Sequence, residues 1–106
     1  MKQAKRRKLE RAGFKVGTVQ EFLGLTDEEM ELIELRIRLV RLLGSTRRTK
    51  GVSQQELARR MASSQSRVAK IEAGGADVTL DLICKALFAL GLSRTDIGRT
   101  ISKRAA

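Results

Sequence analysis

The sequence predicts an all-α domain, because three observations agree. None of the 106 residues is proline, and hydroxyl side chains that can cap a helix precede several stretches with helical apolar spacing. Glycines follow several of these stretches, at positions where a helix can end. With 42% apolar and 32% charged residues, the chain is typical of a globular protein long enough to bury one core.

The first long helix is expected over residues 27–47, inside a predicted domain of residues 27–102. Thr26 can cap it, and carboxylates fill its first turn. It carries two apolar stripes on roughly opposite sides, one formed by Met30, Ile33, Ile37 and Val40, the other by Leu32, Leu35, Leu39, Leu42 and Leu43. Because a helix with two apolar faces must bury both, one stripe is expected in the core and the other against the N-terminal segment or a second subunit.

Four shorter helices are expected downstream, over residues 54–61, 64–73, 79–90 and 93–101. Ser53 and Glu56 have the spacing of a capping box, and Ser63 or Ser64 can cap the following helix. Residues 1–26 are predicted to form a basic, partly helical N-terminal extension, in which Thr18 can cap a short helix. Residues 103–106 are predicted to be a short basic tail.

The net charge of +10 is unevenly distributed and indicates a polyanionic partner. Residues 1–15 carry a net +6, residues 16–35 carry −6 without one basic side chain, and residues 36–50 carry +6. The acidic block is expected to face away from a nucleic acid or towards a basic partner. With three phenylalanines as its only aromatic residues, the chain offers few stacking platforms for single strands, so duplex DNA is the favoured partner.

Several function classes are not expected. Cys84 is the one cysteine and histidine is absent, which excludes a zinc site within one chain and histidine-based acid–base catalysis. There is no glycine-rich phosphate-binding motif, no apolar run long enough for a membrane span and no signal peptide. We therefore expect a cytoplasmic protein that is not an enzyme and needs no cofactor or metal.

The stretch from Gln54 to Ala73 has the spacing of two short helices joined by a tight turn. Leu57 and Met61 are expected to point inward from the first helix, and Val68 and Ile71 from the second. The opposite face of the second helix carries Ser66, Lys70 and Ala73, and its first turn carries Gln65 and Arg67. An α-helix fits the major groove of B-DNA, where such side chains can bond base edges.

The stretch VSQQELARRMASSQSRVAKIEAGG resembles the helix-turn-helix of the XRE family, related to the Cro and repressor proteins of lambdoid phages. This resemblance implies a five-helix lambda-repressor-like domain and a homodimeric transcriptional repressor that binds a double-stranded DNA operator. The upstream GTVQEFLGLTDEEMELIELR is similar to a bacterial subgroup of the HigA-antitoxin type. One alternative is therefore an antitoxin that binds a small basic RelE/HigB-like toxin and autoregulates its operon. Another is a protein-interaction module with only non-specific DNA affinity.

The resemblance implies a role for each matching residue. It places Gln54 on a DNA phosphate, Gln65 and Ser66 on bases with Lys70 one turn further, and Arg67 on bases or phosphate. Ser64, at the start of the same helix, belongs to the predicted DNA-binding set, and Arg47 with Glu72 is expected to form a structural salt bridge. The family often has glycine where this chain has Ala62, so the turn is strained if that residue needs a positive φ.

Overall fold

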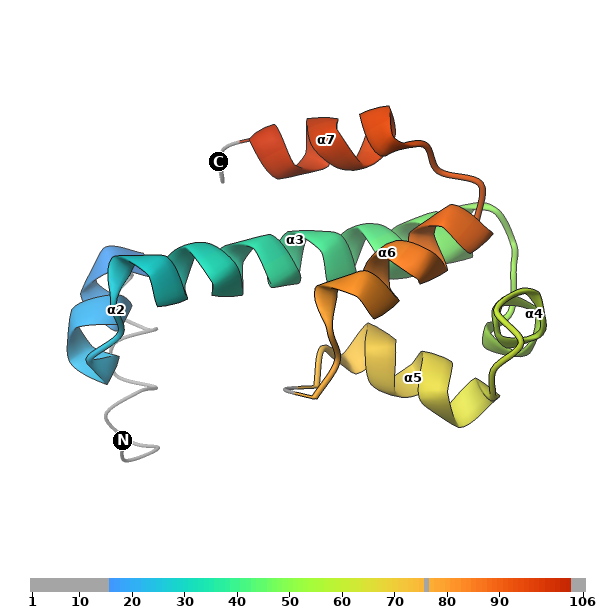
Figure 1. The fold of residues 1–106 in the computed structure, drawn as a ribbon, viewed down its shortest axis with the longest axis horizontal. Helices are drawn as coiled ribbons and strands as arrows, with labels where there is room; N and C mark the ends of the chain where they lie inside the picture. The colour runs from blue at the N-terminus through green and yellow to red at the C-terminus, as the bar shows by residue number, and fades with distance from the viewer. Residues whose placement is uncertain (1–15, 76, 104–106) are drawn as a thin grey trace. The chain divides into compact units, whose positions relative to one another are not determined.

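The computed structural model describes residues 16–75 and 77–103, and within these ranges every regular element is an α-helix (Figure 1). The helices are α2 (Val16–Leu23), α3 (Asp27–Thr49), α4 (Gln54–Arg60), α5 (Gln65–Ala73), α6 (Leu80–Ala89) and α7 (Arg94–Ser102). The predicted all-α class is confirmed, and the five helices expected after residue 26 correspond to α3 through α7. The basic residues 1–15 and 104–106, for which an extension and a tail are predicted, lie outside the described residues.

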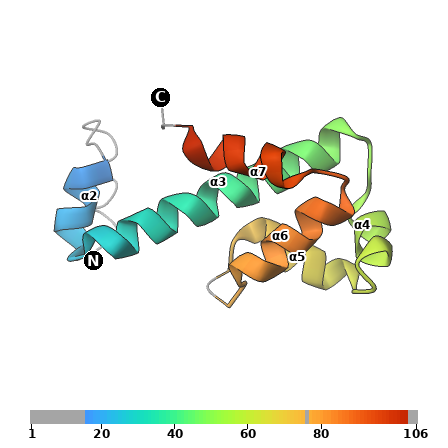
Figure 2. The same ribbon diagram turned by 45° about the horizontal axis from the view of Figure 1, so that its top comes forward.

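By its internal contacts the chain divides into two compact units, Met1–Ile33 and Glu34–Ala106. The division falls within α3, seven residues beyond the predicted domain boundary at residue 27. The second unit contains the rest of α3 and all of α4 to α7. Within it, α7 lies alongside α3 in both views of the ribbon (Figures 1 and 2).

Hydroxyl caps start most of the helices where the sequence places them. Ser64, rather than Ser63, caps α5, because its side chain accepts a hydrogen bond from the backbone N–H of Arg67. The capping box predicted for α4 is only half formed. Ser53 accepts from the Glu56 backbone, but the Glu56 carboxylate binds the side chains of Arg59 and Arg60 instead of reaching back to residue 53.

Two further expectations on the N-terminal side are corrected or refined by the structure. Helix α2 begins at Val16, two residues before Thr18, so Thr18 lies inside the helix and does not cap it. Thr26 starts α3 as expected and forms a full capping box with Glu29. The Thr26 hydroxyl accepts from the Glu29 backbone N–H at 3.1 Å, and the Glu29 carboxylate accepts from the Thr26 backbone at 2.9 Å.

The core of the second unit receives side chains from all five of its helices. Val68 and Ile71, predicted to point inward from α5, are both fully buried. From α4, Leu57 is buried as predicted and Met61 packs partly buried at the edge of the core. The other buried side chains are Leu39, Leu43, Ala58, Val78, Ile83, Ala86, Leu87, Leu90 and Ile97. α5 is thus held by one apolar face, which leaves its opposite face free.

The two stripes of α3 have different fates within the second unit. Leu39 and Leu43 are buried, while Leu35 and Leu42 pack against the core. The other stripe is divided, because Val40 packs against the core whereas Ile37 is 44% exposed. The prediction that one stripe lies in the core is confirmed, and nearly half of the Ile37 surface remains accessible to solvent.

The turn between α4 and α5 is tight because Ala62 adopts a left-handed conformation with φ of 52°. The N–H groups of Ala62 and Ser63 donate to the carbonyls of Arg59 and Ala58, at 3.1 and 2.8 Å. This is the Schellman pattern, in which the left-handed position usually holds glycine. Ala62 therefore bears the strain considered for this position in the sequence, and the turn directs the chain at once into α5.

Candidate nucleic-acid interface

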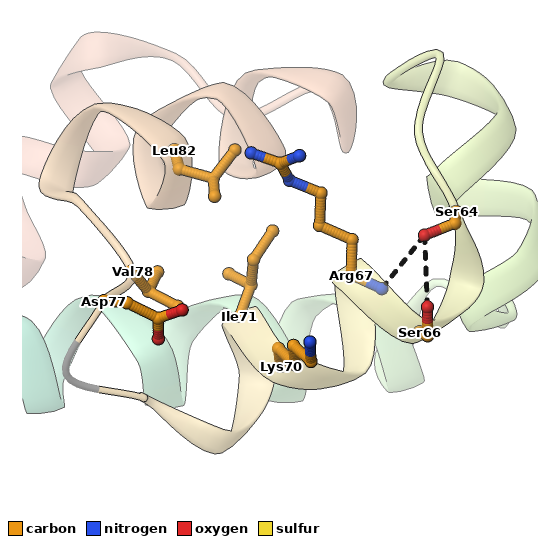
Figure 3. A pocket seen from close by; sticks show the side chains of 8 residues that line it. All are labelled: Ser64, Ser66, Arg67, Lys70, Ile71, Asp77, Val78 and Leu82. Atoms are coloured by element: carbon orange, nitrogen blue, oxygen red, sulfur yellow. Dashed lines mark hydrogen bonds between the residues drawn. The ribbon is translucent and has the colours of Figure 1, made fainter.

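The outer face of α5 carries the polar side chains predicted to contact DNA. Gln65, Ser66, Arg67 and Lys70 are all exposed. Ser66 and Lys70 lie opposite the buried Val68 and Ile71, while the Arg67 side chain extends towards α6 (Figure 3). Ser64 is also exposed, and its hydroxyl lies 3.2 Å from that of Ser66 (Figure 3). The structure thus brings five of the predicted DNA-binding residues together on one turn and a half of helix.

An ion pair between Arg47 of α3 and Glu72 of α5 anchors the C-terminal half of α5. The Arg47 guanidinium donates two hydrogen bonds to the Glu72 carboxylate, at 2.5 and 3.1 Å, and a third to the carbonyl of Val52 at 2.9 Å. The side chains of the pair are only 14% and 11% exposed. Such a two-pronged contact fixes direction as well as distance, so α5 is held in a defined orientation relative to α3.

Gln54 extends this ion pair to the first turn of α5. Its side-chain nitrogen donates to Glu72 at 3.2 Å, and its side-chain oxygen accepts from Gln65 at 3.3 Å. The amide predicted to bind a DNA phosphate is therefore engaged within the protein, where it joins α4 to both ends of α5. We call Arg47, Gln54, Gln65 and Glu72 the polar network.

The protonation state of Glu72 depends on these partners. Burial alone raises the pKa of the carboxyl, but hydrogen bonds from Arg47 and Gln54 lower it by more, and the net pKa lies below its usual value. The same contact raises the pKa of Arg47. Glu72 and Arg47 are therefore both charged at neutral pH.

A hollow of about 370 Å³ lies between the outer face of α5 and α6, and we call it the α5–α6 hollow (Figure 3). Ser66, Arg67 and Lys70 line one side, while Asp77 and Leu82 lie on the other. Within the described residues, the Arg67 and Lys70 side chains make no ion pair or hydrogen bond. Two free cations on an exposed, polar helix face give a surface that favours a polyanion.

Sequence reasoning missed two features of this surface. Asp77 reaches the α5–α6 hollow from the loop before α6, and nothing in the local sequence pattern signals that placement. The link from Gln54 to Glu72 joins residues 18 positions apart on different helices, so it depends on how those helices pack. Both features require the tertiary structure.

Two other kinds of site were sought in the described part of the chain. No group of three or more potential metal ligands occurs there. Over the same ranges, no helix combines the length and apolar character that crossing a bilayer requires.

Comparison with known proteins agrees with the architecture of this surface. No curated protein and no solved structure matches the chain. A helix-turn-helix domain family matches residues 38–99, which run from within α3 into α7 and include the whole exposed face of α5. Helix-turn-helix domains bind DNA by placing their second helix in the major groove. The chain belongs to this helix-turn-helix domain family.

Proposed function

We propose that the protein is a sequence-specific transcription regulator that inserts α5 into the major groove of double-stranded DNA. The observation that carries the proposal is the exposed polar face of α5, held in one orientation by the polar network. Base reading needs a side-chain set that is both available and rigidly aimed. The polar network holds the axis of α5 in a fixed direction relative to α3 and α4, and the buried Val68 and Ile71 fix the rotation of α5 about that axis.

The roles proposed for the individual residues follow from their position and chemistry. Gln65 and Ser66, in the first turn of α5, are placed to read base edges, with Lys70 one turn further along. Arg67 binds phosphate or a base. Gln54 binds a phosphate through hydrogen-bonding capacity not used by Glu72 and Gln65, since an amide nitrogen carries two hydrogens. Ser64, at the start of α5, contacts the sugar–phosphate backbone of the DNA.

Selection from random duplexes, followed by fluorescence anisotropy at about 0.15 M salt, tests this function. We expect a selected site to bind about a thousandfold more tightly than scrambled duplex. The double substitution Gln65→Ala, Ser66→Ala should abolish most of that preference. Gln55→Ala, an exposed glutamine on α4 outside the proposed contact set, is the matched control and should leave the preference unchanged.

The opposite outcome would be equal, weak and steeply salt-dependent binding to every duplex. It would contradict sequence reading and leave a protein-interaction module whose DNA affinity comes from charge alone. Loss of preference in Gln55→Ala but not in the double variant would show that another face of the protein reads the bases.

We further propose that the regulator is a homodimeric repressor of the XRE type. Ile37 on α3 and Ile101 on α7 are both 44% exposed within the second unit, and such side chains gain stability when a second copy covers them. Two copies would place their α5 helices about 34 Å apart on a palindromic operator. Sedimentation should give a dimer for the native protein and for Ser45→Asp, an exposed position on α3, but a monomer for Ile37→Asp. A monomeric native protein, with or without operator, would contradict dimerisation.

A second candidate function is a HigA-type antitoxin, favoured by the surface of the first unit. Glu21, Asp27, Glu28, Glu29 and Glu31 are all exposed there, together with the apolar Leu23, Leu32 and Ile33. An acidic surface with exposed apolar side chains suits a small basic protein such as a ribonuclease toxin. Co-expression with the product of an adjacent gene should yield a complex that Leu32→Asp disrupts. Absence of any complex, or of toxicity to neutralise, would contradict this role.

A further inference from the structure

A second hollow, of about 540 Å³, lies on another side of α5 from the outer face, where the end of α4 and the turn face α6. We call it the α4–α6 hollow. Met61, Leu82 and Phe88 provide its main apolar surface, while Arg60, Arg67 and Lys85 provide three cationic side chains. Its volume falls within the range of about 300–1,000 Å³ that small-molecule sites occupy.

The apolar part of this hollow is unusually open to solvent. Phe88 is 47% exposed although it belongs to α6, whose neighbouring Leu87 is fully buried. A phenylalanine left in this state at the edge of a concave surface gains stability when an apolar group covers it. A ligand for the hollow therefore needs an apolar body.

The charges of the hollow require that the ligand also be an anion. Arg60 is paired with Glu56 at 3.1 Å. Arg67 and Lys85 have no hydrogen-bond acceptor among the residues that the structure describes, and no described side chain lining the hollow carries a negative charge. A carboxylate between these two cations would gain charge-assisted hydrogen bonds that the protein itself does not provide.

We propose that the α4–α6 hollow binds a small carboxylic acid with an apolar body. The body lies on Met61, Leu82 and Phe88, and the carboxylate binds Arg67 and Lys85. Because Arg67 lines both this hollow and the α5–α6 hollow, one guanidinium serves two sites. An acid that engages Arg67 removes a cation from the DNA-facing surface. By linkage, the acid weakens DNA binding and DNA weakens binding of the acid.

Binding is tested first without DNA, so that this part is independent of the proposed function. The probe is 2-naphthoate, and naphthalene-2-carboxamide is its uncharged match. Titration followed by amide NMR should show saturable shifts around Leu82 and Phe88, with a dissociation constant of about 1 mM or tighter, as expected for a ligand of this size. The carboxamide should bind at least about fivefold more weakly, since it lacks the charge.

Variants locate the site. Lys85→Ala and Phe88→Ala should each weaken 2-naphthoate binding about fivefold or more, because each removes one of the two chemistries that the ligand uses. Arg94→Ala, a matched exposed cation on α7, and Leu23→Ala, a matched exposed apolar residue on α2, should leave it unchanged. Equal binding of acid and carboxamide, shifts centred elsewhere or no saturable binding at about 5 mM would each overturn the proposal.

The coupling to DNA rests on the proposed function and has its own test. At an acid concentration near the dissociation constant of the native protein, 2-naphthoate should weaken binding of the selected duplex, and it should do so much less for Lys85→Ala, which binds the acid about fivefold or more weakly. If the acid binds but DNA affinity does not change, the coupling is wrong while the site stands. If no duplex is bound specifically, the proposed function fails. The NMR titration without DNA still shows whether the α4–α6 hollow binds the acid.

Discussion

The two ends of α5 are anchored by different means. At the C-terminal end, Glu72 is bound by Arg47 from α3 and by Gln54 from α4, and the side chains of the ion pair are largely buried. At the N-terminal end, one exposed hydrogen bond from Gln65 to Gln54 reaches another helix, and the other anchors are local: the hydroxyl of Ser64 caps the helix, and Ala62 turns the chain with φ of 52°. The C-terminal end is thus fixed by a largely buried ion pair and side chains from two other helices, and the N-terminal end mainly by the conformation of the backbone just before it.

This difference teaches how a recognition helix can be both stable and well aimed. Contacts between helices resist a change of direction, because moving α5 breaks several hydrogen bonds at once. A cap and a turn determine where the helix begins but exert little hold on its direction. Substitutions at the C-terminal end should therefore cost more stability than substitutions at the N-terminal end.

The largest effect is expected from Arg47→Ala. This change leaves the Glu72 carboxylate, whose side chain is only 11% exposed, without its charged partner, and removing one member of a buried pair costs about 3 kcal/mol or more. The free energy of unfolding, measured with urea, should fall by about that amount. DNA affinity should fall as well, under conditions where the variant is still folded, because Gln54 and Gln65 lose their fixed neighbour.

The matched control is Arg59→Ala, which removes the arginine of another ion pair between arginine and glutamate. Its partner Glu56 belongs to the same helix, and the Arg59 side chain is 75% exposed, so water replaces the lost contact. Stability should change far less than for Arg47→Ala. Equal losses for the two variants would contradict the idea that the contact between helices is what anchors α5.

The second prediction uses pH to test the same anchor. Because the pKa of Glu72 is lowered in the folded state, its contribution to stability is fully present above its unfolded pKa of about 4.5. That contribution is lost as pH falls through the lower, folded-state pKa. Glu72→Gln should cost about 2 kcal/mol at pH 7, from the loss of charge-assisted hydrogen bonds, and the difference from the native protein should narrow below pH 4.5.

The other carboxyls with lowered pKa values do not obscure this comparison. Hydrogen bonds from Arg59 and Arg60 lower the pKa of Glu56 to about 2, and hydrogen bonds with Thr26 and with Ser93 lower the pKa values of Glu29 and Asp96. These groups titrate alike in the native protein and in Glu72→Gln, so they cancel in the difference. A difference independent of pH between 7 and 3 would show that the charge of Glu72 does not stabilise the fold.

The sequence predicts the two ends of α5 to different degrees. Helix starts and the buried Val68 and Ile71 depend on local spacing, and they could be predicted from the residues themselves. The strain at Ala62 follows from the family resemblance, which implies glycine at that position. The Arg47–Glu72 pair was an expectation from family resemblance, because no local rule joins residues 25 positions apart.

The remaining features could not be predicted because they arise from competition for partners. Glu56 has the spacing of a capping-box residue, yet two arginines on its own helix bind its carboxylate more favourably. The family resemblance implies that Gln54 binds a phosphate, yet Glu72 and Gln65 occupy part of its amide. Which neighbour wins depends on three-dimensional distances that spacing alone does not contain.

A smaller effect is expected at the N-terminal end from Ser64→Ala. Loss of the capping hydroxyl leaves the Arg67 backbone N–H without its acceptor and should lower the free energy of unfolding by about 1 kcal/mol. Ser63→Ala, one residue earlier, is the control and should have almost no effect, since Ser63 caps nothing. Thermal unfolding without DNA measures both. The reverse result would assign the cap to Ser63.

The smallest effect, and the one of opposite sign, is expected from Ala62→Gly. Glycine adopts a positive φ without the steric cost that alanine bears, which is about 1–2 kcal/mol. It also gives the unfolded chain more freedom, which offsets roughly 0.4–1 kcal/mol, so the net gain should be about 0.5 kcal/mol. Ala69→Gly, inside α5, should instead lose about 1 kcal/mol. If both variants lost stability, the turn could not be left-handed at residue 62. If Ala62→Gly gained stability with unchanged DNA affinity, the aim of α5 would depend on its C-terminal anchor alone.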